Sequence, residues 1–156
     1  MTRVHIETRL EPAWATVRKI RDQMFRELKE EPAAARAAAS MVASELLENA
    51  IKYGEPVPES PDIRFVFTKS ESVYRIVVSN GVLPGRNVER LLERIDAINK
   101  TEDRSSLYLA RLQELLDNPS QVSGLGIYRI GFEGGFDLEC SYLTNVVTVT
   151  AMRTSV

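Results

Sequence analysis

Residues 44–53 read SELLENAIKY and decide how the rest of the chain is interpreted. At about 100° per residue, Glu45 and Asn49 lie about 40° apart around a helix, and Lys52 lies about 20° to the other side. The neighbouring apolar residues form an adjoining stripe, which consists of Val42, Leu46, Ala50 and Tyr53. The pattern therefore predicts a helix that packs on one side and presents a polar ridge on its flank.

This polar ridge has two interpretations. A carboxylate and a carboxamide at this spacing suit Mg²⁺ and phosphate, with Glu45 as a general base and the amide oxygen of Asn49 as a hard metal ligand. The alternative is an ordinary amphipathic helix with a solvated flank. A second motif favours the first interpretation. Residues 123–126, Ser-Gly-Leu-Gly, precede a short helical segment, and glycines there let backbone N–H groups approach phosphate oxygens.

The two motifs, with a strand pair between them and two strands after them, resemble the GHKL ATPase superfamily over roughly residues 12–153. The small size is similar to that of the anti-sigma-factor serine kinases. A narrower similarity is to the SiaB-like regulators, on the segments NVERLLERIDAIN (87–99), SSLYLARLQELL (105–116) and SGLGIYRI (123–130). The resemblance implies a histidine-kinase-like ATPase fold with ATP and Mg²⁺ as ligands.

The resemblance also implies residue roles. Glu45 would polarise the nucleophile, and Asn49 would hold Mg²⁺ on the triphosphate. Lys52 would close over phosphate. The phosphate loop would consist of Ser123, Gly124, Leu125 and Gly126. Arg129, one turn further on, either adds a phosphate contact or is a solvated surface arginine.

The first glycine box departs from the family pattern of Asp-x-Gly-x-Gly. Here the chain reads Ser79-Asn80-Gly81-Val82-Leu83, so that Ser79 stands for the aspartate that accepts from the adenine amino group. Ser79 Oγ or the Asn80 amide oxygen would replace that carboxylate in part, with Gly81 beside them. We expect weak adenine binding that Ser79→Asp would tighten by about tenfold.

Composition excludes several other classes of function. The net charge of −2 and the absence of a basic cluster argue against nucleic acid. No apolar run is long enough to span a bilayer, and the first residues do not resemble a signal peptide. Cys140 is the only cysteine, which excludes an intrachain disulfide and suits a cytoplasmic location. His5 is the only histidine and lies far in sequence from both motifs.

Hydrophobic periodicity predicts the order of elements. A strand at 3–10 precedes helices at 12–29 and 32–53, the second ending where Gly54 takes a left-handed cap. A hairpin of strands at 63–68 and 73–79 follows a proline-rich loop. Later elements are helices at 86–99, 105–116 and 126–133 and a hairpin at 136–152. This order predicts one α+β domain, a two-layer sandwich of a mixed, mainly antiparallel sheet with helices on one face.

The segment at 86–117 occupies the place of an ATP lid, and its apolar stripe either packs on the domain or receives a partner. The leading hypothesis is an ATP- and Mg²⁺-binding regulator of the partner-switching type that phosphorylates Ser or Thr of a protein partner. That partner would be a STAS-like antagonist, a sigma factor or another small regulator, and a homodimer stays open. The alternative is a binding module on the same fold whose nucleotide site has degenerated.

Overall fold

The computed structural model describes residues 2–117 and 125–154. The elements are β1 (Thr2–Leu10), α1 (Trp14–Glu27), α2 (Ala33–Tyr53), β2 (Ile63–Ser70), β3 (Val73–Gly81), α3 (Arg86–Lys100), α4 (Arg104–Asp117), α5 (Leu125–Phe132), β4 (Asp137–Leu143) and β5 (Val146–Thr154). The predicted elements are all present, with ends shifted by a few residues at most. Ser123 and Gly124 of the predicted phosphate loop lie outside the described residues.

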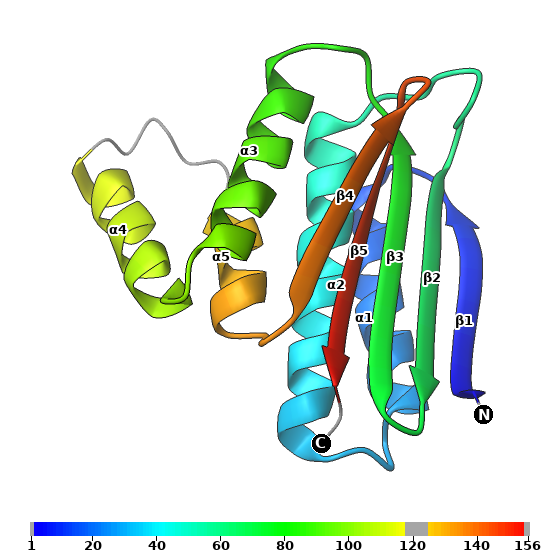
Figure 1. The fold of residues 1–156 in the computed structure, drawn as a ribbon. Coiled ribbons are helices and arrows are strands. Elements are labelled where there is room, and N and C mark those ends of the chain that lie inside the picture. Colours follow the sequence, from blue (N-terminus) through cyan, green and yellow to red (C-terminus); the bar gives the residue numbers. More distant parts are fainter. Residues whose placement is uncertain (1, 118–124, 155–156) are drawn as a thin grey trace.

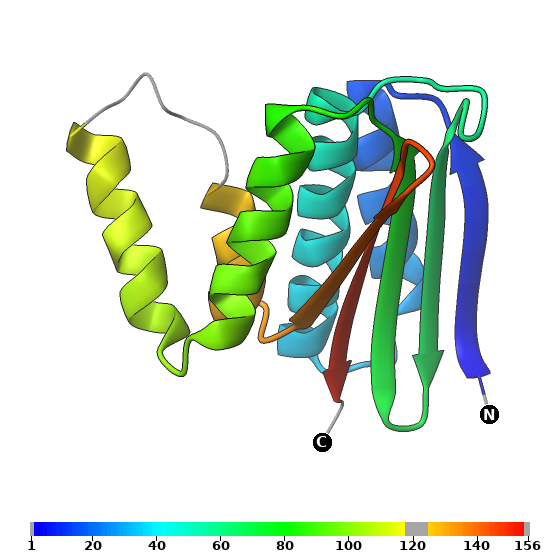
Figure 2. The ribbon, with the colours of Figure 1, turned by 45° about the horizontal axis from the view of Figure 1, so that its top comes forward.

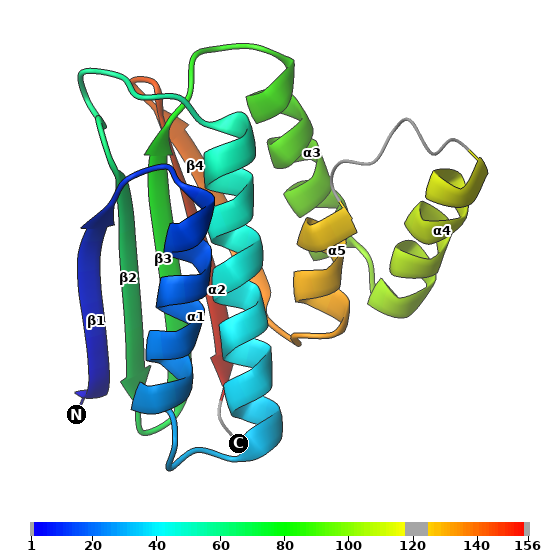
Figure 3. The ribbon, with the colours of Figure 1, turned by 180° about the vertical axis from the view of Figure 1, so that it is seen from behind.

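The strands form one sheet in the order β1-β2-β3-β5-β4, with the helices on one of its faces (Figures 1 and 3). This arrangement confirms the predicted α+β two-layer sandwich. Every pairing between the described strands is antiparallel, so the sheet is antiparallel rather than mixed. The reason is that the closing β4–β5 hairpin places β5, its second strand, beside β3 and leaves β4 at the edge.

The hydrophobic core lies between the sheet and the helices α1 and α2. The longer of the two, α2, is buried along most of its length and contacts β3. Side chains that are fully enclosed there come from the sheet and from both helices, and include Met24, Val42, Leu47, Phe65, Phe67 and Ile76. Because α2 is buried on its apolar side, the polar ridge on its flank is held at a fixed position relative to the sheet.

The two helices of the lid-like segment differ in how they pack (Figure 2). Helix α3 contacts β4 and α5, and three of its side chains, Val88, Ile95 and Ile98, are buried. Helix α4 contacts α5 but contains no buried residue, and its Leu109 is 57% exposed. The segment therefore consists of one helix that belongs to the core and one that lies outside it. No helix in the described part of the chain is long and apolar enough to cross a membrane.

The end of α2 differs from the expectation. Gly54 has φ −83°, so it does not take the predicted left-handed cap. A Cβ atom at this position would lie 2.3 Å from Asn80 Nδ2 and 2.4 Å from the Ala50 carbonyl oxygen. Glycine is required here by a close approach to β3 instead of by backbone conformation. At the end of α5, by contrast, Gly135 has φ +65° and supplies the left-handed residue that stops the helix.

Candidate functional site

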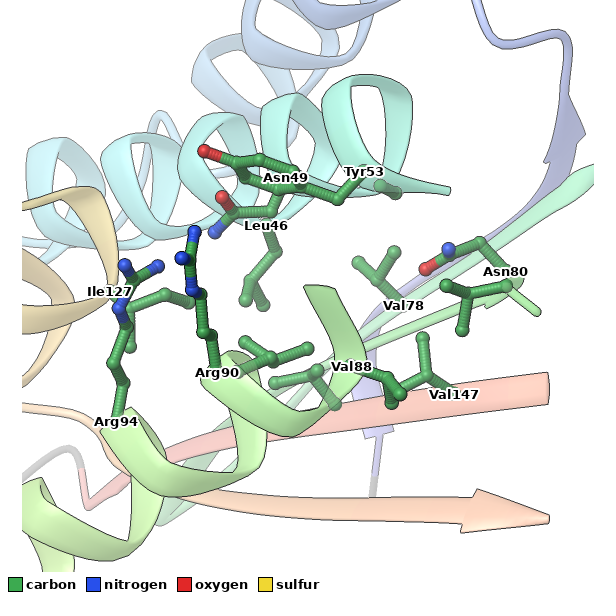
Figure 4. Close-up of a pocket in the computed structure, with 14 residues that line it drawn as sticks. Leu46, Asn49, Tyr53, Val78, Asn80, Val88, Arg90, Arg94, Ile127 and Val147 are labelled. Carbon is green, nitrogen blue, oxygen red and sulfur yellow. The ribbon is translucent and has the colours of Figure 1, made fainter. Parts of the chain in front are cut away.

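A hollow lies between α2 and α3, above β3 and β5 and next to α5 (Figure 4). Its floor is apolar and consists of Val78, Val147 and Val149 with Asn80 at one end. One wall is α2, with Leu46, Asn49, Ala50 and Tyr53, and the other is α3, with Val88, Arg90, Leu91 and Arg94. The hollow therefore combines an apolar floor with a polar rim, which is the usual construction of a small-molecule site.

Two polar atoms on the α2 wall lack a partner. Asn49 Nδ2 and Tyr53 Oη are both buried and form no hydrogen bond within the described residues. Leaving such atoms unsatisfied costs about 1–3 kcal/mol each, so native proteins rarely do so without a reason. Both residues line the hollow, where a bound polar group would satisfy them.

Glu45, one turn before Asn49 on α2, meets the first turn of α5. Its side chain is 18% exposed, and its Oε1 lies 3.3 Å from Arg129 Nη1. A Cβ atom on Gly126 would lie only 2.0 Å from Glu45 Oε2, so this carboxylate fills the space that the glycine leaves open. The structure therefore brings together three sequence-predicted residues: Glu45 and Gly126 in contact, and Asn49 one turn along α2.

Opposing effects act on the pKa of Glu45. Burial, followed by repulsion from Glu48, raises the pKa of this carboxyl, and the Arg129 guanidinium partly offsets the increase. Arg129 also binds Glu133, with Nε 2.6 Å from Oε2. Arg129 is thus an ion-pair partner of the candidate base, which neither reading of this residue from the sequence anticipated.

This arrangement predicts opposite shifts in two variants. Arg129→Gln should raise the pKa of Glu45 further, because it removes the cation that stabilises the carboxylate. Glu133→Gln should lower the same pKa, because it removes a nearby negative charge. A ¹³C NMR titration of the Glu45 carboxyl carbon measures both values directly. Shifts of the same sign in the two variants would contradict the geometry described here.

Ser79 and Asn80 are placed differently from the prediction. Side chains alternate between the two faces of a strand, and it is Asn80, with Val78, that faces the hollow. Ser79 lies on the other face of the sheet, where its Oγ is 2.9 Å from Thr148 Oγ1. The assignment of Ser79 to the adenine position is therefore wrong, and Ser79→Asp is no longer expected to change nucleotide affinity.

Asn80 presents a defined chemical group. Its Nδ2 donates to the Gly81 carbonyl oxygen at 3.0 Å, which leaves Oδ1 as an acceptor toward the hollow (Figure 4). Gly81 itself is required by the loop above it, because a Cβ atom there would lie 2.4 Å from the Glu55 carbonyl oxygen. Leu83, in place of the family's second glycine, is 48% exposed and does not line the hollow.

Lys52 and Cys140 do not line the hollow. Lys52 is exposed, and its Nζ lies 5.3 Å from the centre of the Tyr53 ring. Burial raises the pKa of the Cys140 thiol to about 11, so this thiol is not activated.

Arg90 and Arg94 were not among the site residues predicted from the sequence. Both line the hollow, and their side chains extend from α3 toward Asn49 (Figure 4). The spacing i, i+4 places them on one face of α3. That spacing is visible in the sequence, but it does not show which face of the helix turns toward the site.

These residues fit the polar part of a nucleotide better than its base. No group of three His, Cys, Asp or Glu side chains in the described ranges could hold a metal. Mg²⁺ in nucleotide sites commonly takes one or two protein ligands together with phosphate oxygens, a role open to Asn49. The enclosed volume of about 40 Å³ is far below the roughly 300 Å³ or more of typical ligand sites. A purine would therefore enter only if side chains that line the hollow moved aside.

Comparison with known proteins adds a fold relationship. No protein-family model and no curated protein matches this sequence. Among solved structures, the chain is similar to one in the crystal structure of the SiaB–SiaC complex from Pseudomonas aeruginosa. The TM-score is 0.72 at 16% sequence identity, and the alignment covers 95% of this chain and 88% of that one. The two chains share a fold over almost their whole length.

Proposed function

We propose that this protein is a regulator of the partner-switching type that binds ATP with Mg²⁺ and phosphorylates Ser or Thr of a protein partner. The observation that carries the proposal is the polar rim of the hollow. There the unpartnered Asn49 amide lies one turn from Glu45, which contacts Gly126 at the start of α5. This constellation has the residue types and the order along the chain of the GHKL nucleotide site.

The fold supports a protein partner. The solved structure with the same fold is a complex of two proteins, SiaB and SiaC. This chain shares the fold along 95% of its length, and a small regulator, such as a STAS-like antagonist or a sigma factor, is the partner we propose.

Phosphoryl transfer depends mainly on positioning and on neutralisation of charge, so few residues are needed. Glu45 would accept the proton of the partner's hydroxyl group, and its partial burial beside Arg129 fixes the direction of the carboxylate. Asn49 would bind the metal through its amide oxygen, which a half-turn of the amide brings to the present place of Nδ2. Bound Mg²⁺ would supply charge neutralisation at the phosphate oxygens.

A second candidate function is a binding module that acts without nucleotide. Two observations favour it. The enclosed volume of the hollow is small, and the acceptor that faces it is the Asn80 amide, in place of the carboxylate that the family uses. Titration of the purified protein with Mg-ATP by calorimetry separates the two functions. Binding followed by transfer of radiolabelled phosphate to a partner would support the kinase, and partner binding without nucleotide binding would support the module.

Asn80 gives a sharper test of the nucleotide site. Asn80→Ala should weaken ATP binding by about tenfold, because the acceptor for the adenine amino group is lost. Ser79→Ala is the matched control and should leave affinity unchanged, since Ser79 lies on the opposite face of the sheet. The measurement is calorimetric affinity for ATP and for a purine triphosphate without the 6-amino group. An equal loss for both nucleotides would show that Asn80 does not contact that amino group.

A further inference from the structure

Arg90 and Arg94 form a positively charged pair on the α3 wall of the hollow. Both side chains line the hollow and extend from α3 toward α2, with the end of Arg90 next to Asn49 (Figure 4). The helix that carries them is fixed by the buried side chains Val88, Ile95 and Ile98. The arginine pair therefore belongs to a packed element and not to an unanchored loop.

The arginine pair forms no ion pair in the described part of the chain. Among the described residues, neither arginine has a carboxylate within 4.0 Å, although Lys100, Arg104, Arg111 and Arg129 all do. Like charges at i, i+4 on a helix destabilise it. An anion between the two guanidinium groups would remove that repulsion.

The opposite wall of the hollow holds an unsatisfied amide. Asn49 Nδ2 is buried, has no hydrogen-bond partner among the described residues and faces the same space. Glu45, one turn before Asn49 on α2, is already paired with Arg129. Two guanidinium groups on one wall thus face the Asn49 amide on the other wall, across an apolar floor. Phosphate oxygens with bound Mg²⁺ suit such a set, because the guanidinium groups would donate to the oxygens and the Asn49 amide oxygen would bind the metal.

We propose that Arg90 and Arg94 bind the terminal phosphate groups of the nucleotide. In this arrangement a packed helix neutralises the phosphate charge with side chains that are already in place, without the closure of a mobile lid. This inference rests on the proposed function for the identity of the ligand. It adds that the affinity of the protein for a nucleotide increases with the number of phosphate groups on the nucleotide, and that α3 carries the residues that bind these groups. The pair lay outside the residues that the sequence motifs identified.

The test uses the variant Arg90→Gln/Arg94→Gln. Its charge-matched control is Arg75→Gln/Lys100→Gln, which removes the same number of positive charges. Arg75 lies on β3, on the sheet face away from the helices. Lys100 lies at the far end of α3, where its Nζ is 2.8 Å from Asp96 Oδ2. Calorimetry would compare Mg-ATP, Mg-ADP, adenosine and inorganic tripolyphosphate as ligands. We expect the α3 variant to lose about ten- to a hundredfold in affinity for ATP and tripolyphosphate and little for adenosine. The control variant should bind like the wild type.

The outcomes distinguish this inference from the proposed function. Equal ATP affinity in the wild type and the α3 variant would overturn the role of the arginines, but it would not contradict the proposed nucleotide site. Tripolyphosphate binding that requires the arginines, without ATP binding, would support the phosphate site and count against the proposed function. An equal loss for adenosine and ATP would overturn the inference, because the arginines would then support the fold of the hollow and not the phosphates. Circular dichroism and thermal unfolding verify that both variants are folded.

Discussion

Replacing Glu45 by alanine is expected to reduce phosphoryl transfer to the partner by about 10²–10⁴-fold while leaving the affinity for Mg-ATP nearly unchanged. A general base acts on the proton of the nucleophile and contributes little to binding of the ground state. The side chain is 18% exposed and partly buried as a charge, so its removal should not unfold the domain. Transfer of labelled phosphate and calorimetric affinity, measured on the same preparation, test both parts.

Asn49→Ala is the companion variant, one turn further along α2. It should lower both transfer and Mg-ATP affinity, because it removes the proposed metal ligand that holds the triphosphate. The contrast between the two variants is the informative result. If both bind ATP like the wild type and the wild type itself transfers no phosphate, the binding-module function is favoured. If Glu45→Ala weakens ATP binding as much as Asn49→Ala does, Glu45 is a ligand-binding residue and not the base.

Ile98→Ala is expected to lower the free energy of unfolding by about 2–5 kcal/mol, the usual cost of truncating a fully buried isoleucine. Ile98 is 1% exposed, and its Cγ2 lies 2.9 Å from the position that a Cβ atom on Gly131 would occupy. This close contact joins α3 to α5 at the centre of the lid-like segment. Urea unfolding measures the effect.

Leu109→Ala on α4 is the matched control for this prediction. Leu109 is 57% exposed, and truncation of such a residue should change stability by about 0.5 kcal/mol or less. A small effect of Ile98→Ala, similar to that of Leu109→Ala, would mean that α3 does not belong to the core. The fixed arginine pair would then lose its structural basis.

The sequence predicted the fold well because its elements have strong periodicity. Residues 44–53 could be read as a packed helix with a polar flank, and α2 (Ala33–Tyr53) has that arrangement. The two hairpins were bounded by turn residues, and Thr144 and Asn145 take positive φ angles in the second turn. Local signals of this kind survive in the tertiary structure because they agree with it.

The parts of the site that were missed depend on facts that one sequence does not contain. The choice between Ser79 and Asn80 depends on which face of β3 turns toward the helices, and a shift of one residue reverses it. The role of Arg90 and Arg94 depends on how α3 rotates against α2. The reason for a glycine at residue 54 depends on a distant residue, Asn80, which lies where a Cβ atom would be. Each of these depends on tertiary packing and not on local pattern.

The unsatisfied atoms on α2 imply a conflict between stability and activity. Among the described residues, the buried polar atoms of Asn49 and Tyr53 have no hydrogen-bond partner, and Glu45 is partly buried as a charge. Each of these lowers the stability of the free protein, so apolar replacements on this stripe should often be neutral or stabilising. Selection for thermal stability alone would therefore replace this ridge before any part of the core.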